Sequence, residues 1–321
     1  MNVWRCAIVP DASGATAAAI AAYHPTAYDA NNANPAVRML RYYNASYSSQ
    51  WEGLSSTVGV PLAEARAGGW VLRNSSGKEI THPSWPYNYL CNIGSAGYQD
   101  AWVRNVNGWL LATDADGVYM DDVNPRVGVA LAPADSVWQQ WTDSFLAYVI
   151  PRLNAPVYAN IGWEWDTDAV CRRWVTLVDG VVKEHWMKWG GRDEGYSPEG
   201  TATSPGMFDL QFAYANFVVA QKRSFLALTT SDGQDSRAAR YGIGALLLSN
   251  AWDGYFALSG DFKTDTFRGE HAKAVSLGAP KGPRFRTTYN NWRRTFLHGR
   301  VTVNPSATSR GGLPAFSAVI E

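Results

Sequence analysis

The chain has 321 residues, 46% of them hydrophobic and 17% charged, which is typical of a well-packed globular protein and argues against intrinsic disorder. Basic and acidic residues number 28 each, so the formal net charge is zero, and nothing indicates a nucleic-acid surface or a polybasic membrane patch. The 15 tryptophans and 16 tyrosines are numerous, and such rings either fill a core or stack on the apolar faces of sugars.

The three cysteines, Cys6, Cys91 and Cys171, are odd in number, far apart and set in apolar runs. Neither a disulfide framework nor a metal-ligand spacing follows, so we expect buried free thiols. The N-terminus has no basic region followed by a long apolar run, and no stretch of about 20 apolar residues occurs. We therefore predict no signal peptide and no membrane span, and a protein that stays inside the cell or leaves it without a signal, for example on lysis.

Short apolar segments alternate along the chain with segments that are mostly helical in pattern. The predicted strands are 4–9, 37–43, 87–93, 117–120, 156–160, 180–186, 225–230 and 254–258, and the predicted helices are 15–23, 97–111, 136–153, 167–177, 208–222 and 236–250. The strands lack polar alternation, which indicates that both faces of the sheet are covered. Eight such units in about 260 residues predict an α/β fold, a (β/α)₈ TIM barrel.

An open doubly wound sheet is the competing architecture, but the segment after the first strand, 10–14, lacks the glycine-rich phosphate turn of that fold. The pattern changes after residue 260. A cluster of glycine and proline at 278–283 precedes short strand-like runs that continue to about residue 303. We therefore predict a barrel domain over 1–260 and a small β-rich C-terminal appendage over 261–321, which is too short to bury much core alone.

Catalytic groups of a (β/α)₈ barrel stand at the C-terminal ends of its strands. Asp121 and Asp122 end the predicted fourth strand, and Glu184 lies near the end of the sixth. Glycoside hydrolysis needs such a pair, because one carboxyl group protonates the leaving oxygen while the other attacks carbon or activates water. Strand alternation places Tyr119 with Asp121 and Met120 with Asp122. Since apolar Met120 suits the helix-covered face, we favour Asp121 as the catalytic aspartate and keep Asp122 as the alternative. If Asp121 is catalytic, we expect Asp122 to hold loops or a neighbouring arginine.

Other polar and aromatic residues at the same strand ends are candidates for binding substrate. They are Tyr43, Asn92, Tyr119, Asn160, Trp163, Trp165, His185 and Trp186. Each tryptophan suits packing as well as stacking, and acidic residues at strand ends also cap helices. His185 has no second histidine at ligand spacing, so we expect no metal and no cofactor. The long loop 188–206 is predicted to form a wall or lid beside the substrate.

Several motifs resemble a known family. They are 70–77 (WVLRNSSG), 92–102 (NIGSAGYQDAW), 116–124 (DGVYMDDVN), and 277–280 followed by 294–306 (RTFLHGRVTVNPS). From about residue 35 to 310 the chain resembles glycoside hydrolase-like TIM-barrel families, in particular hypothetical glycosyl hydrolase family 15. The Asp-Gly-x-x-x-Asp form of 116–121 is shared by several retaining glycosidase families. The resemblance implies a glycosidase with Asp121 and Glu184 as its catalytic pair.

The same resemblance indicates a biological setting. Members of such families occur in bacteria and among the minor tail proteins of phages that infect actinobacteria, and the missing signal peptide favours the phage setting. We therefore expect a virion protein that hydrolyses a cell-envelope polysaccharide, with other tail proteins as partners and without nucleic-acid or membrane partners. The alternative is a non-catalytic glycan-binding or structural minor tail protein on the same scaffold. A bacterial protein, extracellular or cytoplasmic, is the alternative location.

Overall fold

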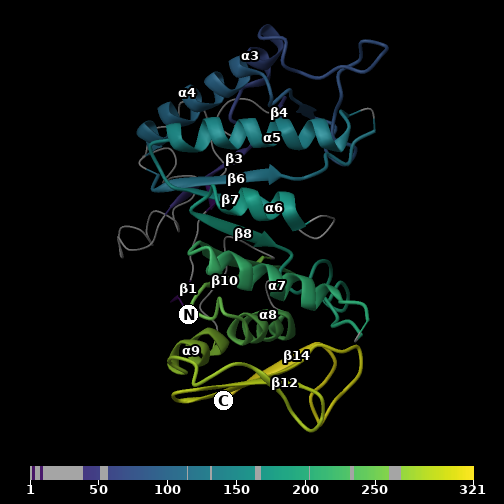
Figure 1. The fold of residues 1–321 in the computed structure, drawn as a ribbon, viewed down its shortest axis with the longest axis vertical. Helices are drawn as coiled ribbons and strands as arrows, with labels where there is room; N and C mark the ends of the chain where they lie inside the picture. The colour runs from purple at the N-terminus through teal and green to yellow at the C-terminus, as the bar shows by residue number, and fades with distance from the viewer. Residues whose placement is uncertain are drawn as a thin grey trace. The chain divides into compact units, whose positions relative to one another are not determined.

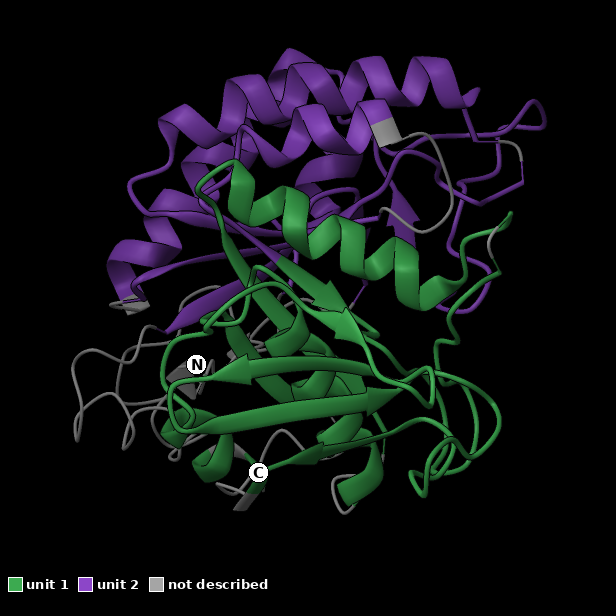
Figure 2. Cartoon of the chain, turned by 60° about the horizontal axis from the view of Figure 1, so that its bottom comes forward, with its two compact units in different colours: residues 1–4, 182–321 green, residues 5–181 purple. Residues whose placement is uncertain are grey.

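The computed structural model describes residues 2–3, 8–9, 39–50, 57–113, 115–130, 132–162, 168–201, 203–231, 235–259 and 269–321. The chain divides into two compact units, which Figure 2 shows in different colours. Residues 5–181 form one, called the N-terminal unit below. Residues 1–4 and 182–321 form the other, called the C-terminal unit.

The N-terminal unit is built on parallel strands covered by helices (Figure 1). Its strands are β2 (Ile8–Val9), β3 (Leu40–Asn44), β6 (Gly117–Val123), β7 (Val157–Ile161) and the first residues of β8 (Gly180–Glu184). They are hydrogen-bonded in the order β2-β3-β6-β7-β8. Its helices are α3 (Leu62–Ala67), α4 (Ala96–Thr113), α5 (Asp135–Val149) and α6 (Asp168–Val175), with a 3₁₀ turn at Ile150–Arg152. Helix α5 packs between α4 and α6, and α6 contacts β7. The strands are apolar on both sides because both faces of a parallel sheet are covered.

The C-terminal unit continues the same alternation and adds an antiparallel sheet. Its parallel strands are the rest of β8, β9 (Ser224–Thr230), β10 (Tyr255–Ser259) and β1 (Asn2–Val3), with helices α7 (Met207–Ala220), α8 (Ser236–Leu248) and α9 (Gly269–Ser276). The antiparallel sheet consists of β11 (Phe285–Arg286), β12 (Trp292–Phe296), β13 (Gly299–Asn304) and β14 (Ser317–Ile320).

Helix α8 joins the two sheets of the C-terminal unit. Its first turn is capped by the Asp235 carboxylate, which accepts a hydrogen bond from the Ala238 N–H at 2.9 Å. One side of the helix contacts β9 and β10, and the other contacts β13 and β14. Gly244 permits this close approach, because a Cβ atom there would lie 2.6 Å from that of Ala318. The antiparallel sheet thus gains its core from α8, which a four-stranded sheet could not supply alone.

The alternation of parallel strands with helices, followed by an antiparallel sheet, confirms the predicted α/β fold class of the TIM-barrel kind. One strand was placed wrongly. Segment 87–93 contains β5 (Asn88–Leu90), but β5 pairs antiparallel with β4 (Tyr47–Ser49) in a separate two-stranded sheet. As a result β3 pairs directly with β6. The cause is the turn after β3, where the Asn44 Oδ1 accepts hydrogen bonds from the Ser46 and Tyr47 N–H groups and leads the chain into β4.

Some expectations fall outside the described residues. Among them are most of the predicted first strand (4–7), the helix at 15–23, Cys6 and the domain boundary at residue 260. Strand β1 pairs with β10, and strand β2 pairs with β3. Among the described residues β1 and β2 do not pair with each other. Cys91 and Cys171 are buried and free, as predicted. No helix in the described ranges is long and apolar enough to cross a membrane.

Candidate active site

The Asp121 carboxylate lies near the carboxyl end of β6 and is held from both sides. It accepts a hydrogen bond from the Tyr42 hydroxyl of β3, a second from the Asn160 side-chain amide of β7 at 3.0 Å, and a third from the Asp122 N–H at 2.8 Å. The neighbouring strands β3 and β7 flank β6, so the side-chain donors approach from opposite directions. All three partners donate to Asp121, which fixes its orientation and gives it the role of an acceptor.

The pairing register explains this arrangement. Tyr42 pairs with Tyr119 and Asn44 with Asp121, and paired residues of parallel strands share a face. The rings of Tyr42 and Tyr119 meet edge-on, with centroids 5.3 Å apart. Beyond Met120 the pairing with β7 shifts register, and Asp122 has a φ of 57°. The bulge ends the alternation of side chains at the strand tip, as β-bulges commonly do.

Asp122 has different partners from Asp121. Its Oδ2 accepts from the Asn44 amide at 2.5 Å and its Oδ1 from the Asn124 amide at 3.3 Å. The Ser46 hydroxyl donates to its carbonyl oxygen at 2.9 Å. Asp122 therefore ties the segments that follow β3 and β6 to one another. Tyr47 follows Ser46 in the chain. Burial is the larger cause that raises the pKa of its hydroxyl, and the charge of Asp122 adds to it.

Two further predicted residues of this unit are placed away from Asp121. Tyr43 lies on the opposite face of β3, where it has no exposed surface and its ring stacks on Trp109 of α4 at 5.4 Å. That position favours packing over contact with a substrate, and burial raises the pKa of its hydroxyl. Asn92 accepts a hydrogen bond from the Gly94 N–H at 3.1 Å, and so shapes the turn that leads into α4.

The remaining candidates belong to the C-terminal unit. Glu184 ends β8 and is half-buried. His185 follows with a φ of 60°, and its Nδ1 lies 2.9 Å from the Thr230 hydroxyl of β9. The exposed ring of Trp189 lies 5.5 Å from the imidazole. Trp186 has no exposed surface, and its Nε1 donates to the Gly242 carbonyl at 2.9 Å, which favours a packing role.

Trp163 and Trp165 lie outside the described residues. Asp121 belongs to the N-terminal unit and Glu184 to the C-terminal unit. Within the described ranges no three His, Cys, Asp or Glu side chains gather as a metal site would require. The chemistry that Asp121 offers is that of an oriented carboxylate at a strand end.

Comparison with protein families decides the affiliation. The model of hypothetical glycosyl hydrolase family 15 matches residues 31–300. This chain belongs to hypothetical glycosyl hydrolase family 15. The match covers Asp121, Asp122 and Glu184 and confirms the resemblance drawn from the sequence motifs.

Solved structures resemble this family 15 chain at low sequence identity. The glycoside hydrolase domain of PelA from Pseudomonas aeruginosa is 13% identical, with 72% of this chain and 81% of that chain covered and a TM-score of 0.45. Ega3 from Aspergillus fumigatus, in complex with galactosamine, is 12% identical, with 66% of each chain covered and a TM-score of 0.39. The α-amylase from Geobacillus thermoleovorans, complexed with acarbose, is 12% identical, with 89% and 69% covered and a TM-score of 0.44. No curated protein matches the chain.

Two residues around Asp121 of this family 15 protein were missed from the sequence. Tyr42 holds the Asp121 carboxylate and Asn44 that of Asp122, whereas the residue predicted from the sequence was their neighbour Tyr43. The alternation of side chains along a strand could have found them. Asn44 pairs with Asp121, and Tyr42 lies on the same face of β3 as Asn44, whereas Tyr43 lies on the other face. That inference required knowing that β3 pairs with β6, which the misplaced third strand concealed.

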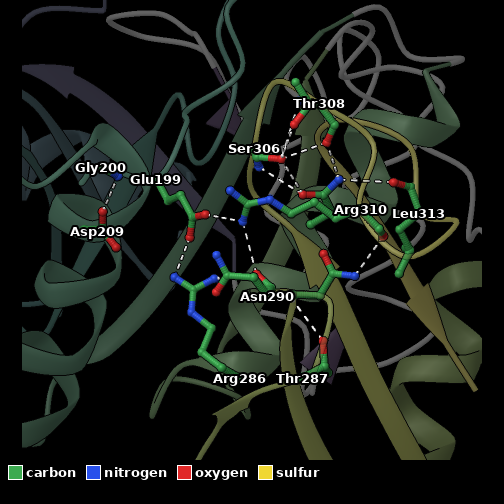
Figure 3. Close-up of polar contacts among 12 residues, drawn as sticks. Glu199, Gly200, Asp209, Arg286, Thr287, Asn290, Ser306, Thr308, Arg310 and Leu313 are labelled. Carbon is green, nitrogen blue, oxygen red and sulfur yellow. Dashed lines mark hydrogen bonds and ion pairs between the residues drawn. The ribbon is translucent and has the colours of Figure 1, made fainter. Parts of the chain in front are cut away.

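The described part of the loop 188–206, which follows β8, is anchored to the antiparallel sheet (Figure 3). Glu199 accepts hydrogen bonds from Arg286 at 2.6 Å and from Arg310, and its N–H donates to the Pro305 carbonyl at 3.0 Å. Both guanidinium groups also donate to the Asn290 carbonyl. At the other end of the loop, Asp209 of α7 accepts from the N–H groups of Gly200 and Gly206, as in a capping box. The loop is therefore fixed by buried charge.

Proposed function

We propose that the protein is a glycoside hydrolase that cleaves a polysaccharide, with Asp121 as one of its two catalytic carboxylates. The observation that carries the proposal is the clamp on Asp121, whose carboxylate is oriented by Tyr42 and Asn160 from the two flanking strands. A carboxylate that attacks the anomeric carbon or activates water must be held as an acceptor in a fixed direction. Membership of a glycosyl hydrolase family supports a glycan as the substrate.

In this proposal Glu184 is the acid that protonates the leaving oxygen, and Asp122 supports the site by holding the segments after β3 and β6. Asp121 and Asp122 lie near the C-terminal end of β6 and Glu184 at the C-terminal end of β8, which is where parallel-strand enzymes place their chemistry. His185, fixed beside Thr230, supplies a hydrogen bond to a sugar hydroxyl. Trp163 and Trp165 are proposed to stack on sugar rings, as expected from their place after β7.

For the substrate we propose a cell-envelope polysaccharide, and for the setting a phage tail in which other tail proteins are the partners. The sequence resemblance motivates this setting. The zero formal net charge gives the protein no general electrostatic attraction to a charged polymer.

The test is the release of reducing ends from purified actinobacterial cell-wall glycans by the wild type, Asp121→Asn and Glu184→Gln. Each variant is expected to lose at least about 100-fold in rate. Asp116→Asn is the matched control, because this exposed aspartate precedes the opposite end of the same strand and accepts a hydrogen bond from the Met39 N–H. Full activity in both Asp121→Asn and Glu184→Gln would overturn the assignment.

Product stereochemistry completes the assignment. Proton NMR of the freshly released anomer distinguishes retention from inversion, and those outcomes require carboxyl separations of roughly 5–5.5 Å and 6.5–9.5 Å, respectively. A wild-type protein that binds these glycans without releasing reducing ends would establish the non-catalytic, glycan-binding alternative instead.

A further inference from the structure

An exposed tryptophan stands on a rigid turn in the N-terminal unit, outside the candidate active site. Trp85 has 54% of its surface exposed, although tryptophan is usually well buried. It lies between Pro83 and Pro86, in the turn that precedes β5. Prolines fix φ on both sides of the indole, so the turn loses little conformational entropy when a ligand binds.

Hydrogen bonds hold the backbone of the turn in place. The Trp85 N–H lies 3.2 Å from both the carbonyl oxygen and the Nδ1 of His82, and its carbonyl accepts from the Asn88 N–H at 2.9 Å. The His82 N–H in turn donates to the Asn88 carbonyl at 2.9 Å. Tyr87 meets the indole edge-on at 6.1 Å, which supports the ring without stacking on it. The backbone that carries the indole is thus held in place, and Tyr87 contacts one edge of the ring.

The hydrogen bonds of His82 select one tautomer of its neutral ring. Its Nδ1 accepts from the N–H groups of Ser84 at 3.1 Å and Trp85 at 3.2 Å, so the ring proton sits on Nε2. Burial lowers the pKa of this imidazole, which favours the same neutral form. A neutral imidazole with an Nε2–H can donate a hydrogen bond to a sugar hydroxyl.

Aromatic contacts connect this turn to the carboxylates. The Tyr47 ring meets His82 edge-on at 5.6 Å, and the Tyr47 N–H donates to the same Asn44 side chain that holds Asp122. Tyr47 is close enough to Asp122 for that charge to raise its pKa. Tyr47 and His82 therefore connect the tip of β6 to the turn that carries Trp85, and all of these residues lie within the N-terminal unit.

We propose that Trp85, with His82 beside it, is an outer subsite that stacks on one pyranose ring of a polysaccharide chain. The C–H face of a pyranose is apolar and matches the exposed indole face, while its hydroxyls reach polar donors at the edge. The proposal deepens the proposed function and rests on it for the class of ligand. It does not require Asp121 to be catalytic, because a stacking surface binds a glycan whether or not the chain is cut.

The test is affinity electrophoresis of the full chain in native gels that contain soluble starch, barley β-glucan, xylan or solubilised actinobacterial cell-wall glycan. Trp85→Ala is expected to weaken the retardation about three- to tenfold, and Trp85→Phe should restore part of it because an aromatic face remains. Tyr289→Ala is the matched control, since Tyr289 is an exposed aromatic residue (67%) of the C-terminal unit. Far-UV circular dichroism verifies that each variant is folded.

Each outcome decides the proposal separately from the proposed function. Retardation of the wild type that is lost in Trp85→Ala and kept in Tyr289→Ala supports the subsite even if no reducing ends are released. With an active enzyme, Trp85→Ala should raise KM for the polymer while kcat, and the hydrolysis of short aryl glycosides, stay unchanged. Equal retardation of Trp85→Ala and the wild type, or no retardation of the wild type in any of the four gels, would overturn the subsite.

Discussion

Replacing Glu199 by alanine removes the charge that anchors the 188–206 loop to the antiparallel sheet. The Glu199 side chain is 8% exposed, and its two oxygens bind Arg286 and Arg310, whose side chains are 35% and 24% exposed. Breaking a fully buried ion pair by removing one partner costs about 3–5 kcal/mol. Because both arginines reach solvent in part and rehydrate, we expect a smaller loss of about 2–4 kcal/mol in the free energy of unfolding.

The matched control for this variant is Glu321→Ala. Glu321 pairs with Arg300 at 2.5 Å, but both side chains are 51% exposed, so the pair is screened by water. Exposed pairs contribute about 0–1 kcal/mol. The two variants therefore change the same chemical interaction at different burial, and only Glu199→Ala should produce a large effect.

The assay is urea unfolding followed by tryptophan fluorescence and far-UV circular dichroism, with coincident transitions as the condition for a two-state analysis. A double-mutant cycle with Arg310→Ala should give a coupling of about 0.5–3 kcal/mol. If Glu199→Ala and Glu321→Ala lower the transition midpoint equally, burial does not determine the strength of the Glu199 cluster, and the reasoning fails.

Four further predictions concern single side chains. Tyr42→Phe should lower kcat about 10- to 100-fold, because it removes a hydrogen bond to the Asp121 carboxylate; a wild-type kcat would contradict the clamp. Tyr43→Phe should leave the stability unchanged or higher, because the Tyr43 hydroxyl is buried without a hydrogen-bond partner among the described residues; a clear loss in urea unfolding would show an undetected partner. Burial lowers the pKa of His82, so its contribution to the free energy of unfolding should be present above about pH 6.5 and be lost as pH falls through the pKa of the folded state. An NMR titration of the folded protein should place this pKa below about 6.5. His82→Asn should flatten the dependence of the free energy of unfolding on pH in that range. Burial raises the pKa of Cys91 to about 11, so mass spectrometry after iodoacetamide treatment at pH 8 should find it unmodified in the folded protein and modified in urea.

Local sequence patterns correctly predicted several strands and the position of Asp121, because these features depend on residues that are close together in the chain. The apolar runs at β6, β7 and β9 predicted strands covered on both faces, and the glycine and proline cluster at 278–283 correctly marked the start of a region with antiparallel strands. The position of Asp121 at a strand tip likewise follows from a short apolar run that ends in acid groups.

Strand pairing was decided only by the tertiary structure. Segment 87–93 has the composition of a buried strand, yet β5 pairs with β4 and leaves β3 beside β6. Composition reports burial and not the identity of the neighbour, since hydrogen bonds between strands are the same for every sequence. That one pairing determines that Tyr42 and Asn44, and not Tyr43 or Asn92, hold the two aspartates.

The sequence by itself determined the fold class, the family and the acidic tip of β6, because each is encoded in contiguous residues. The tertiary structure decided which side chains clamp Asp121, how Glu199 anchors its loop across a separation of 111 residues to Arg310, and which tryptophans are buried. Those features depend on contacts between distant segments, and periodicity along the chain carries no information about such contacts.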